Sequence, residues 1–419
     1  MGKKEIKTLS EGSTDNWVRQ IFVNTSRKDA ILIPVLSVFT ALIIGAIIIA
    51  VSDPKTLDAS KSFLIAPGRV FSFAGKAISD AYKAMLEGAF GNPANIFQAF
   101  KTFLSSGETK SLLNELRPIG ESLVITTPYI FAGLGVALSF QGGMVNIGAE
   151  GQLFMAGMAS VFVGYAVKGI PWFVHLPLAL FAGFAAGALW GFIPGYLKAK
   201  TGAHEVINTI MMNYIAFRLT DYLLSGPMAK TSNLPVSPEV LPSAYLPKLL
   251  GSPVRAHWGF LLALLFAWLI HFLLFKTTLG LEIRMTGKNP RASRYAGISV
   301  ISMTAITMAL SGGIAGLAGA SQLLGVDHRM VRAFSSGYGF DAIALALLGN
   351  NNPLGVVFAS LLFGFLRGGA ARMQSVAGTP VELIRIIQGV VIIFVAAPKI
   401  IRGLYHIKDP DQNAPAAVE

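Results

Sequence analysis

Long uncharged apolar tracts are the feature that most constrains this 419-residue chain. Ala30–Ser52 runs for about 23 residues without a charge, enough to cross the roughly 30 Å hydrocarbon core of a bilayer. From Ser122 to Ala149 there is again no charged residue, and after Glu150 none occurs until Lys168. A buried core helix of a soluble protein needs only about 10 to 14 apolar residues. These tracts therefore predict an all-α polytopic membrane protein.

Composition agrees with a membrane protein. The chain is 53% hydrophobic and 13% charged, with a mean hydropathy of +0.59, whereas a soluble domain carries about 25% charged residues. The absence of cysteine excludes disulfides and thiolate metal sites, and the six histidines show no paired metal-ligand spacing, so we expect no metal site and no cofactor. The net charge of +12 could suggest nucleic-acid binding. In a membrane protein, however, the distribution of Lys and Arg first indicates which loops are cytoplasmic.

Eight further spans are predicted after Ala30–Ser52. Asp53–Arg117 has mixed charge and a weakly amphipathic pattern, so it is expected to form interfacial helices on the outer side of the membrane. The predicted spans are Pro118–Phe140, Glu150–Val167, Trp172–Leu197, Val206–Leu224, Trp258–Phe275, Tyr295–Leu324, Phe340–Leu366 and Val381–Pro398.

The distribution of Lys and Arg orients these spans, because cytoplasmic loops are enriched in both. The segment before Ala30, the loop Lys276–Arg294 and the residues after Pro398 are basic. We therefore predict that they are cytoplasmic, together with the turn Lys198–His204. Termini on the same side require an even number of crossings, whereas the tracts number nine.

A break in Phe340–Leu366 resolves the odd count. Gly349-Asn-Asn-Asn-Pro-Leu-Gly355 interrupts this tract, and Gly, Asn and Pro do not easily continue a helix. The arm Gly339–Leu348 has about ten residues, or roughly 15 Å of helix, which is half of the bilayer core. Counting both arms predicts about ten transmembrane crossings, including broken helices.

A second polar run, Val145-Asn-Ile-Gly-Ala-Glu-Gly-Gln152, lies among apolar residues. Irregular backbone is tolerated within a membrane only where it is buried in protein or lines a watery cavity, and breaks at corresponding places in two halves indicate a transporter's path. We therefore predict two pseudo-repeated halves with a polar path at the breaks. The glycine-rich run Ser311–Ala320 is explained as well by close helix packing.

Five stretches, in order along the chain, carry a resemblance to a known family. The chain resembles permease subunits of ATP-binding-cassette (ABC) importers for nucleosides and simple sugars, most of all the general nucleoside branch, within the superfamily that also contains branched-chain amino-acid permeases. The five stretches are Ser139–Gln152, His204–Ile215, Thr278–Ile298, Ser311–Ala320 and Gly337–Asn350.

The resemblance implies partners. Such a permease is one half of a two-permease core, coupled to a cytoplasmic ABC ATPase and supplied by an extracytoplasmic substrate-binding protein; we expect the second permease to be a related chain more than an identical one. This chain lacks a Gly-x-x-x-x-Gly-Lys-Ser/Thr phosphate loop, so it is expected to be a non-catalytic subunit. The expected location is the bacterial cytoplasmic membrane, crossed many times, with both termini cytoplasmic.

The charge pattern and the resemblance together predict a division of the chain and a docking loop. The expected parts are a cytoplasmic segment (1–29), a first transmembrane helix (30–52), an extracytoplasmic interfacial segment (53–117), a permease domain (118–402) with a cytoplasmic coupling loop (276–297), and a cytoplasmic tail (403–419). In the coupling loop, the residues expected to contact the ATPase are Glu282, Arg284, Gly287, Lys288, Asn289, Pro290 and Arg291.

A nucleoside is neutral and rich in hydroxyls, so amides and carboxylates suit its path. The candidates for lining the path are Asn146, Glu150, Gln152, Asn213, Phe340, Asp341 and Asn350. For Glu150, a bracing hydrogen bond to a neighbouring helix explains the residue equally well. Two alternatives stay open: an ABC permease for a simple sugar or a branched-chain amino acid, and an ion-coupled secondary transporter in which Glu150 and Asp341 bind protons or cations.

Overall fold

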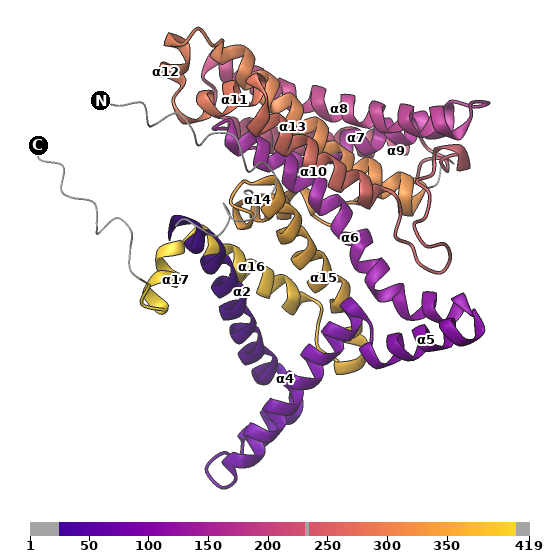
Figure 1. Cartoon of the computed structure of the whole chain (residues 1–419), viewed down its shortest axis with the longest axis vertical. Helices are drawn as coiled ribbons and strands as arrows, with labels where there is room; N and C mark the ends of the chain where they lie inside the picture. Colours follow the sequence, from indigo (N-terminus) through magenta and orange to yellow (C-terminus); the bar gives the residue numbers. More distant parts are fainter. Residues whose placement is uncertain (1–24, 231–233, 408–419) are drawn as a thin grey trace, which may run out of the picture. The chain divides into compact units, whose positions relative to one another are not determined.

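The computed structural model describes residues 25–230 and 234–407, and this part of the chain is helical without a strand (Figure 1). In chain order the helices are α2 (Thr25–Ser52), α3 (Pro54–Ser60), α4 (Pro67–Phe90), α5 (Pro93–Ser106), α6 (Thr109–Gln141), α7 (Ala149–Ala166), α8 (Trp172–Thr201), α9 (Glu205–Ser225), the 3₁₀ turn η1 (Pro242–Ala244), α10 (Gly259–Lys276), α11 (Thr278–Lys288), α12 (Pro290–Tyr295), α13 (Val300–Gln322), the π-helical η2 (Leu323–Asp327), α14 (Tyr338–Leu348), α15 (Pro353–Ala377), α16 (Glu382–Ala396) and α17 (Pro398–Leu404).

Within these ranges, six helices are long and apolar enough to cross a membrane. They are Leu32–Ser52 of α2, α6, α8, α10, α13 together with η2, and α15; α16 with α17, bent by 91°, adds a seventh if the pair is one span. The predicted multi-pass helical membrane protein is thereby confirmed. The tracts predicted at Glu150–Val167 and Val206–Leu224 are also helices, α7 and α9, but their polar side chains leave them less apolar than the six.

Three predicted boundaries differ clearly from the structure, and one of them is the end of Phe340–Leu366, because α15 continues to Ala377. α6 begins at Thr109, and Pro118 lies inside it; Pro128 is a second internal proline, so neither residue marks a helix start. α13 begins at Val300 rather than Tyr295, because Pro290–Tyr295 forms the separate helix α12. Helix bounds depend on caps that apolarity alone does not reveal: Ser299 accepts a hydrogen bond from the Ser302 amide and caps α13.

The predicted break in Phe340–Leu366 is present. α14 ends at Leu348 and α15 begins at Pro353, where the Asn352 side chain accepts a hydrogen bond from the Leu354 amide (3.0 Å). Asn350 and Asn351 have φ angles of 52° and 53°, the left-handed region that Asn tolerates better than most residues. The turn and its cap explain why the helix stops where the sequence becomes polar.

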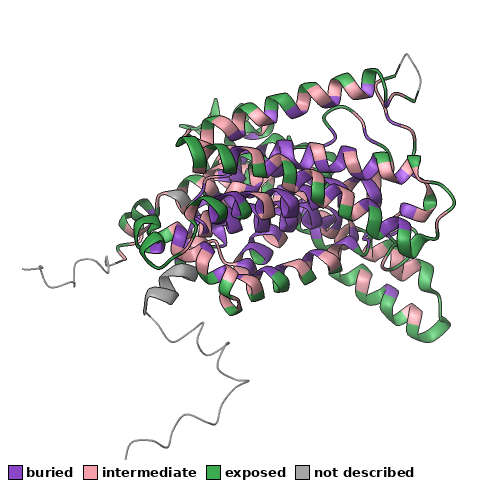
Figure 2. Ribbon diagram, turned by 90° about the horizontal axis from the view of Figure 1, so that it is seen from above, coloured by how far each residue is buried: buried purple, intermediate pink, exposed green. Residues whose placement is uncertain are grey.

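The described residues form two compact units, one within residues 1–47 and 385–419 and the other within residues 48–384. In the larger unit α13 packs against α8, α6 and α7, and α15 packs against α4 and α6 (Figure 1). Buried residues gather along the inner sides of these helices, and exposed residues on their outer sides (Figure 2).

Glycines bring α8 and α13 into backbone contact. A Cβ atom on Gly187 would lie 2.5 Å from the Gly312 carbonyl oxygen, and one on Gly312 would lie 2.4 Å from the Gly187 oxygen. Such an approach is open only to glycine. The run Ser311–Ala320 thus serves close helix packing.

Candidate functional site

The polar run Val145–Gln152 joins α6 to α7 and is closed by buried amides. The Asn146 side chain donates from Nδ2 to Gln152 Oε1 (2.9 Å) and to Ser311 Oγ (2.8 Å). Its Oδ1 accepts from the Gly148 amide (2.9 Å). Asn146 and Gln152 are both buried, so these bonds replace the water that would otherwise satisfy the broken helix.

Asn213 of α9 closes the same run from the other side. Its Oδ1 accepts from the Gly151 amide (2.8 Å), and its Nδ2 donates to the Ile147 carbonyl (2.9 Å). One buried side chain therefore satisfies both an N–H donor and a carbonyl acceptor of the interrupted backbone. This role explains why α9 carries an asparagine at this position.

Glu150 links α7 to α14. Its carboxylate Oε2 accepts a hydrogen bond from the Gly339 amide (2.7 Å), in the first turn of α14. Both helices begin here, and the carboxylate is stabilised by amides at the starts of helices. This contact supports the interpretation that Glu150 braces a neighbouring helix through a hydrogen bond.

The two breaks also meet at their other ends. Gln141, the last residue of α6, donates from Nε2 to the carbonyl oxygen of Asn351 in the turn between α14 and α15 (3.0 Å). Two polar segments about 200 residues apart in sequence are thus joined into one assembly.

A charged cluster beside the start of α14 joins the predicted path residue Asp341 to Tyr129 and Arg367, which the sequence did not single out. Arg367 of α15 donates to the Tyr129 hydroxyl (2.7 Å) and to the Ser336 carbonyl (3.0 Å), and Tyr129 donates to Asp341 Oδ2 (2.7 Å). The guanidinium carbon lies 5.9 Å from the Tyr129 ring centre and 5.1 Å from that of Tyr338. Arg367 was passed over because it directly follows the predicted span; an arginine between apolar stretches of one long helix was the available signal.

The seven predicted path residues separate into two groups. Asn146, Glu150, Gln152 and Asn213 are buried and bonded to protein groups. The other three, Phe340, Asp341 and Asn350, retain exposed surface: Phe340 is 47% exposed, the Asp341 side chain is 33% exposed, and Asn350 is exposed in the turn after α14.

The predicted coupling loop forms α11 and α12. Asn289 ends α11, and its side chain accepts from the amides of Arg291 and Ala292 to begin α12 at Pro290. Lys288, Asn289, Pro290 and Arg291 are exposed, whereas Glu282 and Arg284 are half-buried, with Arg284 lying over the Phe275 ring (5.1 Å). The loop therefore presents a short preformed basic helix.

Gly287 joins this loop to the first break. A Cβ atom on Gly287 would lie 2.3 Å from the Gln141 oxygen and 2.7 Å from the Gly143 nitrogen. These backbone atoms immediately precede the polar run Val145–Gln152. The predicted coupling loop and the broken helix are therefore in direct contact.

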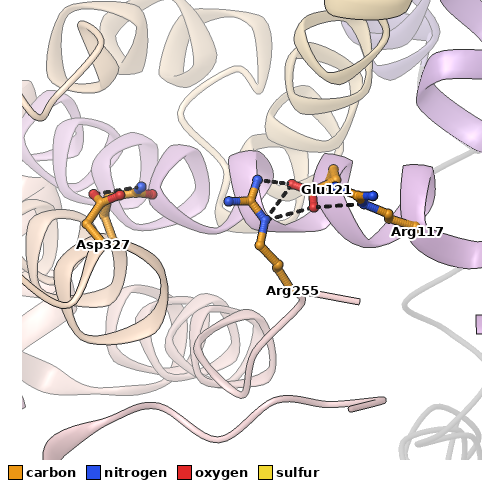
Figure 3. Close-up of polar contacts among 5 residues, drawn as sticks. Arg117, Glu121, Arg255 and Asp327 are labelled. Atoms are coloured by element: carbon orange, nitrogen blue, oxygen red, sulfur yellow. Dashed lines mark hydrogen bonds and ion pairs between the residues drawn. The ribbon is translucent and has the colours of Figure 1, made fainter. Parts of the chain in front are cut away.

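In the first half of α6, Glu121 holds a loop residue through an ion pair. Arg255 donates from Nε to Glu121 Oε1 (2.8 Å) and from Nη2 to Oε2, and Arg117 lies on the other side of the carboxylate (Figure 3). Hydrogen bonding to Glu121 raises the pKa of Arg255. The pair fastens the segment before α10 to α6.

His257, two residues further on, is buried and neutral. Burial, with a smaller effect from the nearby His328, lowers the pKa of His257 to about 4. Its Nδ1 accepts from the Gly259 amide at the start of α10 (3.1 Å), which requires an unprotonated nitrogen. Protonation of this histidine would break its bond to the first amide of α10 and would cost stability.

Interrupted helices braced by buried polar side chains, in a multi-pass helical membrane protein, define a transport protein. Residues 119–396 match the family described as "Branched-chain amino acid transport system / permease component". The chain belongs to this family.

Relatives agree with the assignment. The guanosine ABC transporter permease protein NupP of Bacillus subtilis (strain 168) is 39% identical over 90% of this chain and 96% of its own length. The glucose ABC transporter permease protein TsgB13 of Haloferax volcanii is 38% identical over 65% of this chain and 74% of its own, and NupQ, also named a guanosine permease of Bacillus subtilis, is 30% identical over 64% and 85%. No solved structure matches. These relatives confirm a non-catalytic ABC permease subunit.

Proposed function

We propose that this chain forms half of a path for nucleosides across a bacterial cytoplasmic membrane, as the permease subunit of an ABC importer. The observation that carries the proposal is the pair of breaks joined by Glu150 and Gln141, with the half-exposed Phe340 and Asp341 beside them. NupP aligns with 90% of the chain, and its name, a guanosine permease, supports a nucleoside as the substrate.

The buried amides and Glu150 act as a scaffold in this proposal, and the accessible residues line the path. Asn146, Gln152 and Asn213 keep the irregular backbone rigid, because each is engaged with backbone or side-chain groups. Phe340, Asp341 and Asn350 then meet the substrate. A weakly interacting, hydrated route suits an importer, because a tight site would retain the substrate.

Ten crossings complete the proposed topology, with both termini cytoplasmic. They are α2, α6, α7, α8, α9, α10, α13, the segment 328–348 containing α14, α15 and α16. Two contacts support it: a Cβ atom on Gly287 of the basic loop would lie 2.3 Å from the Gln141 oxygen at the end of α6, and the Leu241 amide donates to the Gly164 carbonyl (2.9 Å) near the end of α7, which the proposed topology puts on the opposite side. The two broken segments are the proposed counterparts of two pseudo-repeated halves.

Partners follow from the same topology. The exposed basic surface of α12 is the proposed docking site of the cytoplasmic ATPase, and an extracytoplasmic binding protein delivers the substrate from the other side. The second permease is proposed to be a related chain, because NupP and NupQ are two different guanosine permeases of one organism. Charge reversal at Arg284 and Arg291 is expected to abolish substrate-stimulated ATP hydrolysis by the complex; unchanged stimulation contradicts this docking site.

Measurements of uptake by cells test which substrate this permease carries. Cells lacking this protein should lose uptake of radiolabelled nucleosides. The intact gene should restore this uptake, whereas a copy with charge reversals in α12 should not. Unlabelled ribose and leucine should not compete. Undiminished nucleoside uptake without the protein contradicts the proposal.

A sugar is the second candidate, since TsgB13, named for glucose, is 38% identical. The same experiment separates the two. Loss of labelled glucose or ribose uptake with intact nucleoside uptake would favour the sugar.

A further inference from the structure

The outer part of α9 carries an exposed row of side chains in which a charge lies among aromatic residues. Tyr214, Arg218, Tyr222 and Ser225 lie on one face of this helix, because each is three or four residues from the next. The Arg218 side chain is 86% exposed, and Tyr214 is 59% exposed. In the proposed topology Arg218 lies roughly 10 Å below the outer end of α9, so this face exposes a charge within the membrane.

The surroundings of Arg218 are polar as well. Asp221 lies 3.7 Å from Arg218 and 3.3 Å from Arg332, and Arg332 donates from Nη2 to Ser225 Oγ (2.9 Å). With Tyr222 these residues line an open hollow of about 470 Å³. Ionisable side chains within membrane-spanning segments face the interior of a bundle or a water-filled cavity, because exposure to lipid is costly. The hollow therefore indicates water at this face of α9.

The segment beside the hollow is irregular. Residues 328–337, between the end of η2 and the start of α14, form no helix, and Arg332, Ala333 and Ser336 among them are exposed. α14 is 11 residues long, about 16 Å, and it ends at the turn that bonds the end of α6. The irregular segment therefore covers the outer half of its crossing. Exposed irregular backbone does not occur against lipid, but it can line a watery cavity.

These two surfaces are continuous with the residues proposed to line the path. Arg332 fixes the irregular segment to Asp221 of α9. The last residue of the segment, Gly337, directly precedes α14, whose first turn carries Phe340 and Asp341. An accessible strip thus runs from the outer end of α9 to the middle of the membrane.

We propose that the face of α9 around Arg218, with residues 332–337, forms one wall of a water-filled outer vestibule through which the substrate reaches Asp341. The second permease forms the opposite wall. The exposed ion pairs of this wall stay hydrated, so they let a neutral solute pass without retaining it. This inference rests on the proposed nucleoside path and assigns its outer half.

The reactivity of single cysteines tests the vestibule, because the native chain contains none. Tyr214→Cys is the first probe, since it lies roughly 16 Å below the outer end of α9, far from the membrane surface. Trp268→Cys of α10 is the matched control. Trp268 is also 59% exposed, lies at a similar depth, and shares its helix face with the apolar Leu265 and Phe272.

The complete importer, with its ATPase, second permease and binding protein, is reconstituted in proteoliposomes. A charged, membrane-impermeant methanethiosulfonate is then added from the outer side. The thiolate is the reactive form, and it forms less readily in an apolar environment than in water. Tyr214→Cys is expected to react at least about tenfold faster than Trp268→Cys, because even one unit of pKa changes the thiolate fraction tenfold. Equal rates would place lipid or a dry protein contact against α9 and overturn the inference.

Ser336→Cys is a second probe, and it changes only the oxygen of an exposed side chain to sulfur. It should also react at least about tenfold faster than Trp268→Cys. The attached reagent should block nucleoside uptake in both probes, whereas treated Trp268→Cys should keep its uptake. Slow labelling of either probe in an importer that still takes up nucleosides overturns the vestibule alone. Fast labelling of an importer that takes up no nucleoside refutes the proposed function and leaves the vestibule standing.

Discussion

Gly287→Ala tests whether the coupling loop acts on the broken helix through direct backbone contact. The new Cβ atom would lie 2.3 Å from the Gln141 carbonyl oxygen and 2.7 Å from the Gly142 carbon and the Gly143 nitrogen. All three atoms belong to the backbone, so no side-chain rotation relieves the overlap. Either α11 or the end of α6 must shift.

The magnitude follows from two opposing effects. Overpacking a tight contact costs about 1 to 3 kcal/mol, whereas replacing glycine by alanine within a helix gains roughly 0.5 to 1 kcal/mol. Subtracting the gain from the cost weakens the contact by about 0 to 2.5 kcal/mol, with a centre at roughly 1.3 kcal/mol. Because about 1.4 kcal/mol is a factor of ten, the population of the docked loop should fall roughly tenfold relative to displaced positions.

The assay is substrate-stimulated ATP hydrolysis, and substrate transported per ATP, by the reconstituted complex. Gly287→Ala should bring stimulation close to the basal rate while the complex still assembles. Gly75→Ala is the control, because Gly75 also lies in a helix, α4, and a Cβ atom there has no neighbour within 4 Å. If both variants retain full stimulation, the contact between Gly287 and α6 does not transmit the signal.

Three further predictions concern the scaffold, the outer loop and the topology. Asn213→Ala leaves two buried backbone groups unpaired and should lower the stability of the detergent-solubilised protein by about 2 to 4 kcal/mol; a shift in unfolding midpoint no larger than that of Asn95→Ala, a change at an exposed position of α5, would contradict the scaffold. Because the folded pKa of His257 is about 4 and the unfolded value about 6.5, stability is complete above pH 6.5 and falls as the pH drops towards 4. The loss should be about 2 kcal/mol at pH 5 and should be absent in His257→Gln; an equal pH dependence in the two proteins would count against it. Since the chain has no cysteine, a single cysteine at Tyr295, which is 94% exposed, should react with an impermeant maleimide only from the cytoplasmic side, and one at Leu64, 97% exposed, only from outside; labelling from the opposite sides would reverse the topology.

The class of the protein and its principal break were determined by the sequence itself. Uncharged tracts such as Ala30–Ser52 cross a bilayer whatever their neighbours are, because the solvent imposes the requirement on each segment separately. The run Gly349–Gly355 interrupts a helix through its own backbone preferences. Both features are local, so the amino-acid sequence alone was sufficient to predict them. The five ordered motifs were sufficient to indicate the family.

Only the tertiary structure decided what each polar side chain does. Glu150 and Asp341 look alike in sequence, yet one is buried against the Gly339 amide and the other is held at an accessible position by Tyr129. That difference depends on which distant helix lies opposite, and sequence periodicity reports the face of a helix without naming its partner. For the same reason Arg367 was missed, because its role exists only where α6, α14 and α15 meet.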